Sequence, residues 1–167
     1  MAGSLTYVKG DATQPAGDGP KFIIHVCNDL GRWGAGFVMA LSRRWPEPQI
    51  AYYAYAEEAG CWPLGHTTKP VLVEENLWVI NMIAQRGIGK RFEAAPPIRY
   101  KAVRNCLKDV ATNARNPAYK GDSESVSIHC PKFGAGLAGG DWRVIEQLIQ
   151  EELVDKGLSV TVYEFDG

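Results

Sequence analysis

Residues 21–45, KFIIHVCNDLGRWGAGFVMALSRRW, combine a strand pattern, a glycine-rich turn and a helix pattern in one continuous unit. The mostly apolar, β-branched run at 22–27 predicts a buried strand. A glycine-rich turn at 31–36 follows it, and from Phe37 apolar residues recur on one helical face up to Trp45. Glycines allow the main chain to approach a ligand closely, and a helix N-terminus is electropositive. The stretch therefore fits an anion-binding loop, and it equally fits a turn that only connects a strand to a helix.

A second unit of the same design lies near the C-terminus. Residues 125–130 predict a strand, residues 131–140 form the glycine-rich segment PKFGAGLAGG, and a helix is predicted from Asp141. In parallel α/β sheets ligands bind at the carboxyl ends of the strands, so both glycine loops are expected at the same edge. Two convergent loops of this kind indicate a ligand with a diphosphate, or with two separated anionic or sugar groups.

The rest of the chain alternates between strand and helix patterns. Strands are predicted at residues 5–8, 64–73, 77–84 and 158–165, and helices at 50–59 and from Pro96 to residue 114. A polar loop is predicted at 116–124, and Gly157 is predicted to end the helix that starts at Asp141. This alternation predicts an α/β fold of three layers with a largely parallel central sheet.

The composition is that of an ordinary globular protein, and we expect residues 1–167 to form a single domain. The net charge of −1 gives no general attraction to nucleic acids or anionic membranes, so neither is expected as a partner. No apolar run is long enough to span a bilayer, and the N-terminal residues lack a signal-peptide pattern. The four cysteines show no CxxC spacing and suit reduced thiols, so a cytoplasmic location is expected.

Several well-known catalytic motifs are absent from the sequence. It contains neither the GxxxxGK[ST] motif of P-loop nucleotide hydrolases nor the GxSxG motif of serine hydrolases. His25 and His129 lie in apolar strand runs, where a structural role is favoured over catalysis or metal binding. No His/Cys spacing matches a zinc site. We therefore expect no metal and no cofactor.

Four short motifs occur in order along nearly the whole chain: VKGDAT at 8–13, HVCNDLGRWGAGF at 25–37, PKFGAGLAGGDW at 131–142 and VTVYEF at 160–165. Together they resemble the motifs of macrodomains, which bind ADP-ribose. The closest similarity is to the ALC1-like branch, which includes human terminal ADP-ribose protein glycohydrolase and bacterial relatives. The resemblance implies a three-layer α/β/α macrodomain fold with a mixed, largely parallel central sheet. Members of this branch remove ADP-ribose from acidic side chains or deacylate O-acyl-ADP-ribose, whereas other macrodomains only bind.

The resemblance also assigns the parts of a ligand to residues of this chain. It implies that the Asp11 carboxylate accepts a hydrogen bond from the adenine amino group; alternatively, Asp11 caps a turn. The first glycine loop would line the distal ribose and the diphosphate, and the second would close over the phosphates with main-chain N–H groups. Tyr163 or Phe165 on the last strand would stack against adenine. The complete predicted ligand-binding set is Asp11, Ala12, Asn28, Arg32, Trp33, Gly34, Ala35, Gly36, Gln85, Phe133, Gly134, Ala135, Gly136, Leu137 and Tyr163.

The sequence departs from the family pattern at two positions that matter for catalysis. The human glycohydrolase has a lysine where this chain has Gln85, and an aspartate where it has Ala138. Glutamine cannot form the covalent adduct that a lysine forms, so the expected mechanism is direct attack by water. Asn28, Gln85 and Asp141 are the predicted catalytic residues, which would orient that water. Asp141 fits a helix N-cap equally well.

The leading hypothesis for the function is an enzyme that hydrolyses ADP-ribose from mono-ADP-ribosylated proteins, in which it is ester-linked to glutamate or aspartate. Its partners would be ADP-ribose and ADP-ribosylated proteins, and it would act as a monomer. One alternative is a non-catalytic reader of ADP-ribose. Another is a hydrolase of O-acyl-ADP-ribose or of ADP-ribose 1''-phosphate, which would use the same pocket.

Overall fold

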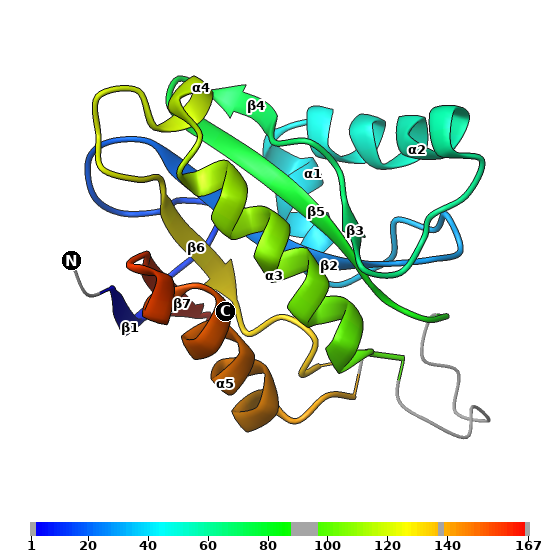
Figure 1. The fold of residues 1–167 in the computed structure, drawn as a ribbon. Helices are drawn as coiled ribbons and strands as arrows, with labels where there is room; N and C mark the ends of the chain where they lie inside the picture. Colours follow the sequence, from blue (N-terminus) through cyan, green and yellow to red (C-terminus); the bar gives the residue numbers. More distant parts are fainter. Residues whose placement is uncertain (1–2, 88–96, 137–138, 166–167) are drawn as a thin grey trace.

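A computed structural model describes residues 3–87, 97–136 and 139–165 and shows a central sheet with helices on both faces (Figure 1). The strands are β1 (Ser4–Lys9), β2 (Lys21–Asn28), β3 (His66–Thr67), β4 (Val71–Glu74), β5 (Leu77–Gln85), β6 (Ser127–Pro131) and β7 (Ser159–Glu164). The helices are α1 (Phe37–Arg44), α2 (Glu47–Ala59), α3 (Tyr100–Ala114), α4 (Pro117–Lys120) and α5 (Trp142–Glu152), with a 3-10 turn, η1 (Val154–Lys156).

The order of strands in the sheet is β1-β7-β6-β2-β5-β3, and β4 also pairs with β5. Neighbouring strands from β1 to β5 along this order run parallel, whereas β3 and β4 are antiparallel to β5. The predicted α/β fold with a mixed, largely parallel sheet is therefore confirmed. In the described part of the chain, none of the helices is both long and apolar enough to cross a membrane.

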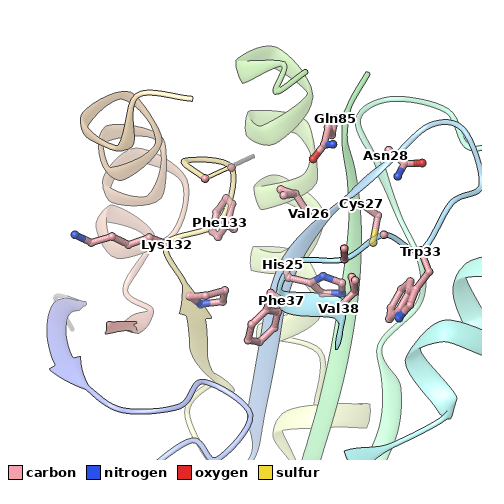
Figure 2. Close-up of a pocket in the computed structure, with 16 residues that line it drawn as sticks. His25, Val26, Cys27, Asn28, Trp33, Phe37, Val38, Gln85, Lys132 and Phe133 are labelled. Carbon is pink, nitrogen blue, oxygen red and sulfur yellow. The ribbon is translucent and has the colours of Figure 1, made fainter. Parts of the chain in front are cut away.

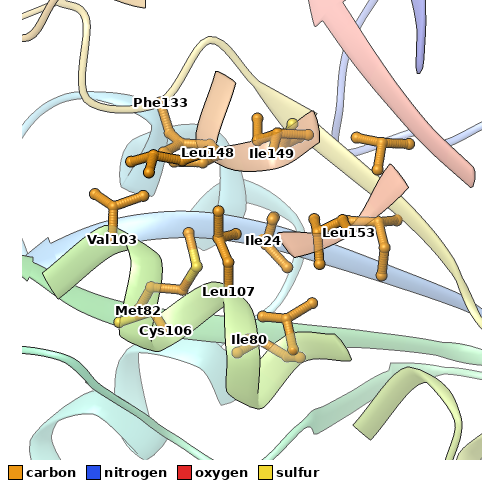
Figure 3. Packing of buried hydrophobic residues seen from close by; sticks show 14 of the residues in the cluster. Ile24, Ile80, Met82, Val103, Cys106, Leu107, Phe133, Leu148, Ile149 and Leu153 are labelled. Carbon is orange, nitrogen blue, oxygen red and sulfur yellow. The ribbon is translucent and has the colours of Figure 1, made fainter. Parts of the chain in front are cut away.

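Each face of the sheet has its own hydrophobic core because successive side chains of a strand point to opposite faces. Along β2, Phe22 and Ile24 pack into the larger core beneath α3 and α5. Figure 3 shows Ile24 within this core. Ile23 and Cys27 pack into the smaller core beneath α1 and α2. The strand is consequently buried on both sides, as its nearly continuous apolar sequence predicts.

The carboxyl ends of the parallel strands β2, β5 and β6 lie side by side at one edge of the sheet. The central strand, β2, lies between β5 and β6. The pairing of β2 with β5 shifts register after Cys27, so that Asn28 lies opposite Gln85. The two glycine loops follow β2 and β6 at this edge, where the sequence predicts them.

The largest difference from the predicted elements lies at residues 64–73. Instead of one strand, this segment forms the two short strands β3 and β4, separated by residues 68–70. Pro70 lies in the gap and has no N–H group for the ladder, which explains the interruption.

Further differences are a short additional helix and the position at which α5 ends. The predicted polar loop at 116–124 contains the short helix α4, whose first turn is capped by the Asn116 side chain accepting from the Ala118 N–H. The helix α5 ends at Glu152, before the predicted end at Gly157. Gly157 instead ends η1, with a φ of 91° that favours glycine.

Candidate functional site

A cavity of about 250 Å³ lies at the carboxyl edge of the sheet, between the two glycine loops (Figure 2). Its walls come from β2, β5, the first loop with the start of α1, and the loop after β6. It is lined by His25, Val26, Cys27, Asn28, Trp33, Gly34, Ala35, Gly36, Phe37, Val38, Gln85, Pro131, Lys132, Phe133, Gly134 and Gly136.

The first loop presents unpaired main-chain donors to this cavity. Within the described residues, the N–H groups of Gly34, Ala35 and Gly36 have no hydrogen-bond acceptor. The helix α1 begins directly after them at Phe37 and has no side-chain cap at its N-terminus. Gly34 adopts a φ of 96°, which side chains other than glycine rarely allow. The loop therefore offers both N–H groups and a helix N-terminus to an anion.

The second loop is folded back on itself and presents donors from the opposite wall. Its closure uses two main-chain hydrogen bonds, from Gly140 N to Gly134 O at 2.8 Å and from Gly139 N to Gly136 O at 3.0 Å. The N–H groups of Gly134 and Gly136, which line the cavity, find no acceptor among the described residues. A Cβ atom on Gly134 would come within 2.9 Å of both Ile98 and Ile145, so the loop can pack this closely only with glycine there. Two such donor sets facing one cavity fit a diphosphate.

Asn28 holds the first loop in place. Its Nδ2 donates to the Arg32 carbonyl at 2.6 Å, and its Oδ1 accepts from Leu30 N at 3.0 Å and from Arg32 N at 3.3 Å. The Tyr52 hydroxyl also lies 2.9 Å from this Oδ1. The Asn28 side chain lines the cavity but is only 5% exposed. Its polar atoms are thus already used within the protein.

Tyr52 is a site residue that the sequence analysis missed. It is fully buried on α2, and its hydroxyl lies 2.8 Å from the Asn28 carbonyl oxygen. Trp62 stacks on its ring at 5.4 Å and donates its indole N–H to the Tyr52 carbonyl. Trp62 also packs so closely on Gly31 that a Cβ atom there would come within 2.3 Å of the indole. The sequence shows a tyrosine-rich helix, but it does not show which tyrosine reaches the loop.

Removing the Tyr52 hydroxyl should weaken this support. We expect Tyr52→Phe to lower the free energy of unfolding by about 1 kcal/mol, because Asn28 loses a buried partner. Urea denaturation measures the change, and Tyr53→Phe is the matched control because Tyr53 lies on the same helix and is 43% exposed. Equal effects of the two substitutions would contradict the role assigned to Tyr52.

Gln85 lies at the end of β5 and lines the cavity. Its Nε2 donates to the Gly87 carbonyl at 3.2 Å, while its Oε1 has no partner among the described residues. Asp29 stabilises the end of β5 with two hydrogen bonds. Its N–H donates to the Gln85 carbonyl and its Oδ1 accepts from Gly87 N, both at 2.9 Å. Gln85 thus offers an open acceptor to the cavity from a fixed position.

Asp11 lies outside this cavity, beside a separate hollow of about 300 Å³ that is also lined by Thr13, Ala40, Arg43 and Arg44. Its Oδ1 accepts from the main-chain N–H and the hydroxyl of Thr13, at 2.8 and 2.7 Å. Its Oδ2 lies 3.8 Å from Arg44 Nη2. Asp11 therefore stabilises a turn and still has an oxygen exposed to a ligand.

The two aromatic candidates on β7 differ in exposure. Tyr163 is 5% exposed, and its hydroxyl accepts from Ala16 N at 2.9 Å and lies 2.8 Å from His129 Nδ1. Phe165 is 69% exposed. It directly follows Glu164, whose carbonyl accepts a hydrogen bond from Gly10 N. The exposed ring at the end of β7 is therefore that of Phe165, whereas Tyr163 anchors the loop that contains Ala16.

Asp141 caps the start of α5. Its Oδ1 accepts from Arg143 N at 2.9 Å, and its Oδ2 pairs with Arg143 Nη2 at 3.1 Å. These hydrogen bonds lower the pKa of the Asp141 carboxyl. Asp141 is not among the residues that line the cavity.

The remaining predicted residues are divided between the cavity and its surroundings. Arg32 is exposed, Ala12 is buried, and neither lines the cavity; Ala135 does not line it either. Leu137 and Ala138 lie outside the described residues. The predicted residues that the structure brings together around the cavity are Asn28, Trp33, Gly34, Ala35, Gly36, Gln85, Phe133, Gly134 and Gly136.

The arrangement of the described side chains determines whether a metal ion could bind, and burial determines the protonation state of the cavity thiol. Over residues 3–87, 97–136 and 139–165, no group of three His, Cys, Asp or Glu side chains is placed to hold a metal ion. The thiol of Cys27 lines the cavity, but burial raises its pKa well above the usual value. A thiol held in the protonated form is a poor nucleophile.

Solved structures show the same fold with substantial sequence identity. A protein of unknown function from Bacteroides thetaiotaomicron is 48% identical, with a TM-score of 0.87, and the match covers 98% of this chain and 99% of that one. A macrodomain protein from Streptomyces coelicolor is 43% identical, with a TM-score of 0.78 and coverage of 96% and 99%. DarTG from Thermosipho africanus, solved in complex with ADP-ribose, shares the fold at 18% identity and a TM-score of 0.67, with coverage of 96% of this chain and 41% of that one.

Curated proteins give more distant matches, and no protein-family model matches the chain. The mouse chromodomain-helicase-DNA-binding protein 1-like is 28% identical over 97% of this chain, which spans only 18% of that protein. The ADP-ribose 1''-phosphate phosphatase of Saccharomyces cerevisiae is 24% identical, and the match covers 96% of this chain and 98% of that enzyme.

Proposed function

The chain belongs to the macrodomain family, and on that premise we propose that its cavity binds ADP-ribose and that the protein hydrolyses the ester between ADP-ribose and a glutamate or aspartate side chain. The observation that carries this proposal is the pair of glycine loops, whose unpaired N–H groups face one cavity. An ionised diphosphate is rich in acceptors and has no donors, so it matches these walls.

The adenosine end of the ligand would lie toward Asp11 and Phe165. The Asp11 Oδ2 is an acceptor suited to an adenine amino group, and its partner Arg44 is 3.8 Å away. The exposed ring of Phe165 provides a surface on which a base can stack. This arrangement leaves the distal ribose and its ester near the ends of β2 and β5.

Hydrolysis of the ester requires one water molecule. The water supplies the hydroxyl group to one product and a proton to the other, which leaves free ADP-ribose and a carboxylic acid. The Gln85 Oε1 would accept a hydrogen bond from this water and so orient its attack. The loop N–H groups would stabilise the negative charge that develops on the reacting oxygen.

Gln85 is better suited to this role than the other two predicted catalytic residues. The polar atoms of Asn28 hold the first loop, and Asp141 caps α5 on the protein surface. Asn28 would then act indirectly, by keeping the first loop in the shape that the ligand needs.

Two other functions use the same cavity. A non-catalytic reader is favoured by the sequence itself, because Gln85 and Ala138 occupy the positions of the catalytic lysine and aspartate in the human glycohydrolase. An ADP-ribose 1''-phosphate phosphatase is favoured by the yeast relative, which matches nearly the whole chain.

One set of assays separates the three functions. We expect the protein to release ADP-ribose from a glutamate-ADP-ribosylated substrate faster than a control without enzyme, which measures spontaneous ester loss. Calorimetric binding of ADP-ribose without any release would identify a reader. Release of phosphate from ADP-ribose 1''-phosphate alone would identify a phosphatase, and failure to bind ADP-ribose would overturn the proposal altogether.

A further inference from the structure

His25 lines the cavity from β2 and is only 1% exposed. Its imidazole is packed edge-on against Trp33, with ring centroids 5.7 Å apart, and lies 5.8 Å from the ring of Phe37 (Figure 2). A polar ring in such an apolar setting requires hydrogen-bond partners for its nitrogen atoms.

The hydrogen bonds around His25 determine which ring nitrogen carries the proton. The Pro48 carbonyl can only accept, so the nitrogen of the Asn81 side chain must face it, at 3.0 Å. The Asn81 Oδ1 is therefore the atom that faces His25 Nε2, at 2.5 Å. Because this oxygen can only accept, Nε2 carries the hydrogen.

In the neutral ring this leaves Nδ1 as an acceptor with a free lone pair. Nδ1 is buried and has no hydrogen-bond partner among the described residues. Burial lowers the pKa of His25 to about 4, so the ring is neutral at physiological pH. The buried His129 differs, because its Nε2 lies 2.8 Å from the Ser127 hydroxyl and its Nδ1 lies 2.8 Å from the Tyr163 hydroxyl.

Nδ1 has no contact with solvent in the unliganded protein, because the rings of Trp33 and Phe37 pack against the imidazole. We propose that the bound nucleotide displaces one of these rings and that His25 Nδ1 then accepts a hydrogen bond from a ribose hydroxyl. This inference rests on the proposed function and adds an acceptor subsite to it. The cavity walls are otherwise rich in N–H donors, which suit phosphates. An ionised phosphate oxygen would face the Nδ1 lone pair without a proton between them, whereas a sugar hydroxyl supplies the proton that Nδ1 lacks. His25 is thus a ligand-positioning residue that excludes phosphate from its part of the cavity.

NMR of protein labelled with ¹⁵N at histidine tests this directly. Long-range ¹H–¹⁵N correlations should show His25 as the Nε2–H form, and saturation with ADP-ribose should move its Nδ1 resonance upfield as the lone pair accepts a hydrogen bond. His129 is an internal control, because both of its nitrogens already have partners. Binding of ADP-ribose by calorimetry without a His25 Nδ1 shift would overturn this inference alone. Absence of binding would overturn the proposed function, and the inference with it.

Ligand analogues identify the hydroxyl. For the unmodified protein, we expect one ribose-deoxy analogue of ADP-ribose to bind about tenfold more weakly than ADP-ribose, as the loss of one hydrogen bond implies. In His25→Phe, that analogue and ADP-ribose should bind equally well, because the acceptor is gone. Circular dichroism checks that the variant folds. If every single-deoxy analogue binds the unmodified protein as tightly as ADP-ribose does, the proposal is wrong. This conclusion does not depend on the affinities measured for His25→Phe.

Discussion

Replacing Gln85 by alanine is expected to lower the rate of ADP-ribose release about a hundredfold, because the attacking water loses its fixed orientation. Affinity for ADP-ribose should change by less than about threefold, because the loop N–H groups that hold the diphosphate stay in place. The side chain is well placed for this role. Its Nε2 is tied to the Gly87 carbonyl, and its Oε1 is left open at the cavity.

Single-turnover release of ADP-ribose and calorimetric binding measure the two effects separately. Gln147→Ala is the matched control, since Gln147 is an exposed glutamine on α5 whose side chain pairs with Glu151. Asp141→Ala should lower the melting temperature through loss of the α5 cap. An equal loss of binding and turnover in Gln85→Ala would make Gln85 a ligand contact. A larger loss of turnover in Asp141→Ala than in Gln85→Ala would move the catalytic role to the second loop.

The fold could be predicted from the sequence because its central elements carry strong local signals. The strands β2 and β5 are long apolar runs, and the glycine loop after β2 is followed directly by helical periodicity. The strand boundaries within residues 64–73 could not be predicted as well, because the apolar residues of this segment are compatible with one strand. The break at Pro70 becomes clear only when β3 and β4 each pair with β5.

Only those parts of the site that consist of a short, continuous motif could be predicted from the sequence. Both glycine loops were found because their shape depends on glycines close together in the sequence. Tyr52 and Asn81 were missed because their roles depend on partners that are distant along the chain, Asn28 and His25. The free lone pair of His25 likewise depends on the packing of β2 against β5, α2 and the first glycine loop. No sequence pattern shows this packing. Local spacing therefore predicts main-chain geometry better than it predicts which side chains remain free.

Lowering the pH from 7.5 to 5 is expected to reduce the free energy of unfolding by about 4 kcal/mol, because two histidines are buried in the neutral form. Burial is the main cause that lowers the pKa of His25 and of His129 to about 4, and the charge of Lys21 adds to it at His129. In the unfolded chain each imidazole has a pKa of about 6.5. Between these values the unfolded state binds more protons than the folded state, so stability falls as the pH falls. Each ring contributes about 1.4 kcal/mol per pH unit below pH 6.5.

Urea denaturation at pH 7.5, 6.5, 5.75 and 5, at constant ionic strength, measures this dependence. His129→Gln should remove about half of the slope, since only His25 then remains as a buried imidazole. Most carboxylates stay ionised in this range, so the slope reports mainly on the histidines. A free energy of unfolding that changes by less than about 1 kcal/mol would contradict the prediction. It would mean that both rings accept protons in the folded protein, and a His25 that is protonated so readily would have no reliable lone pair to offer a ribose hydroxyl.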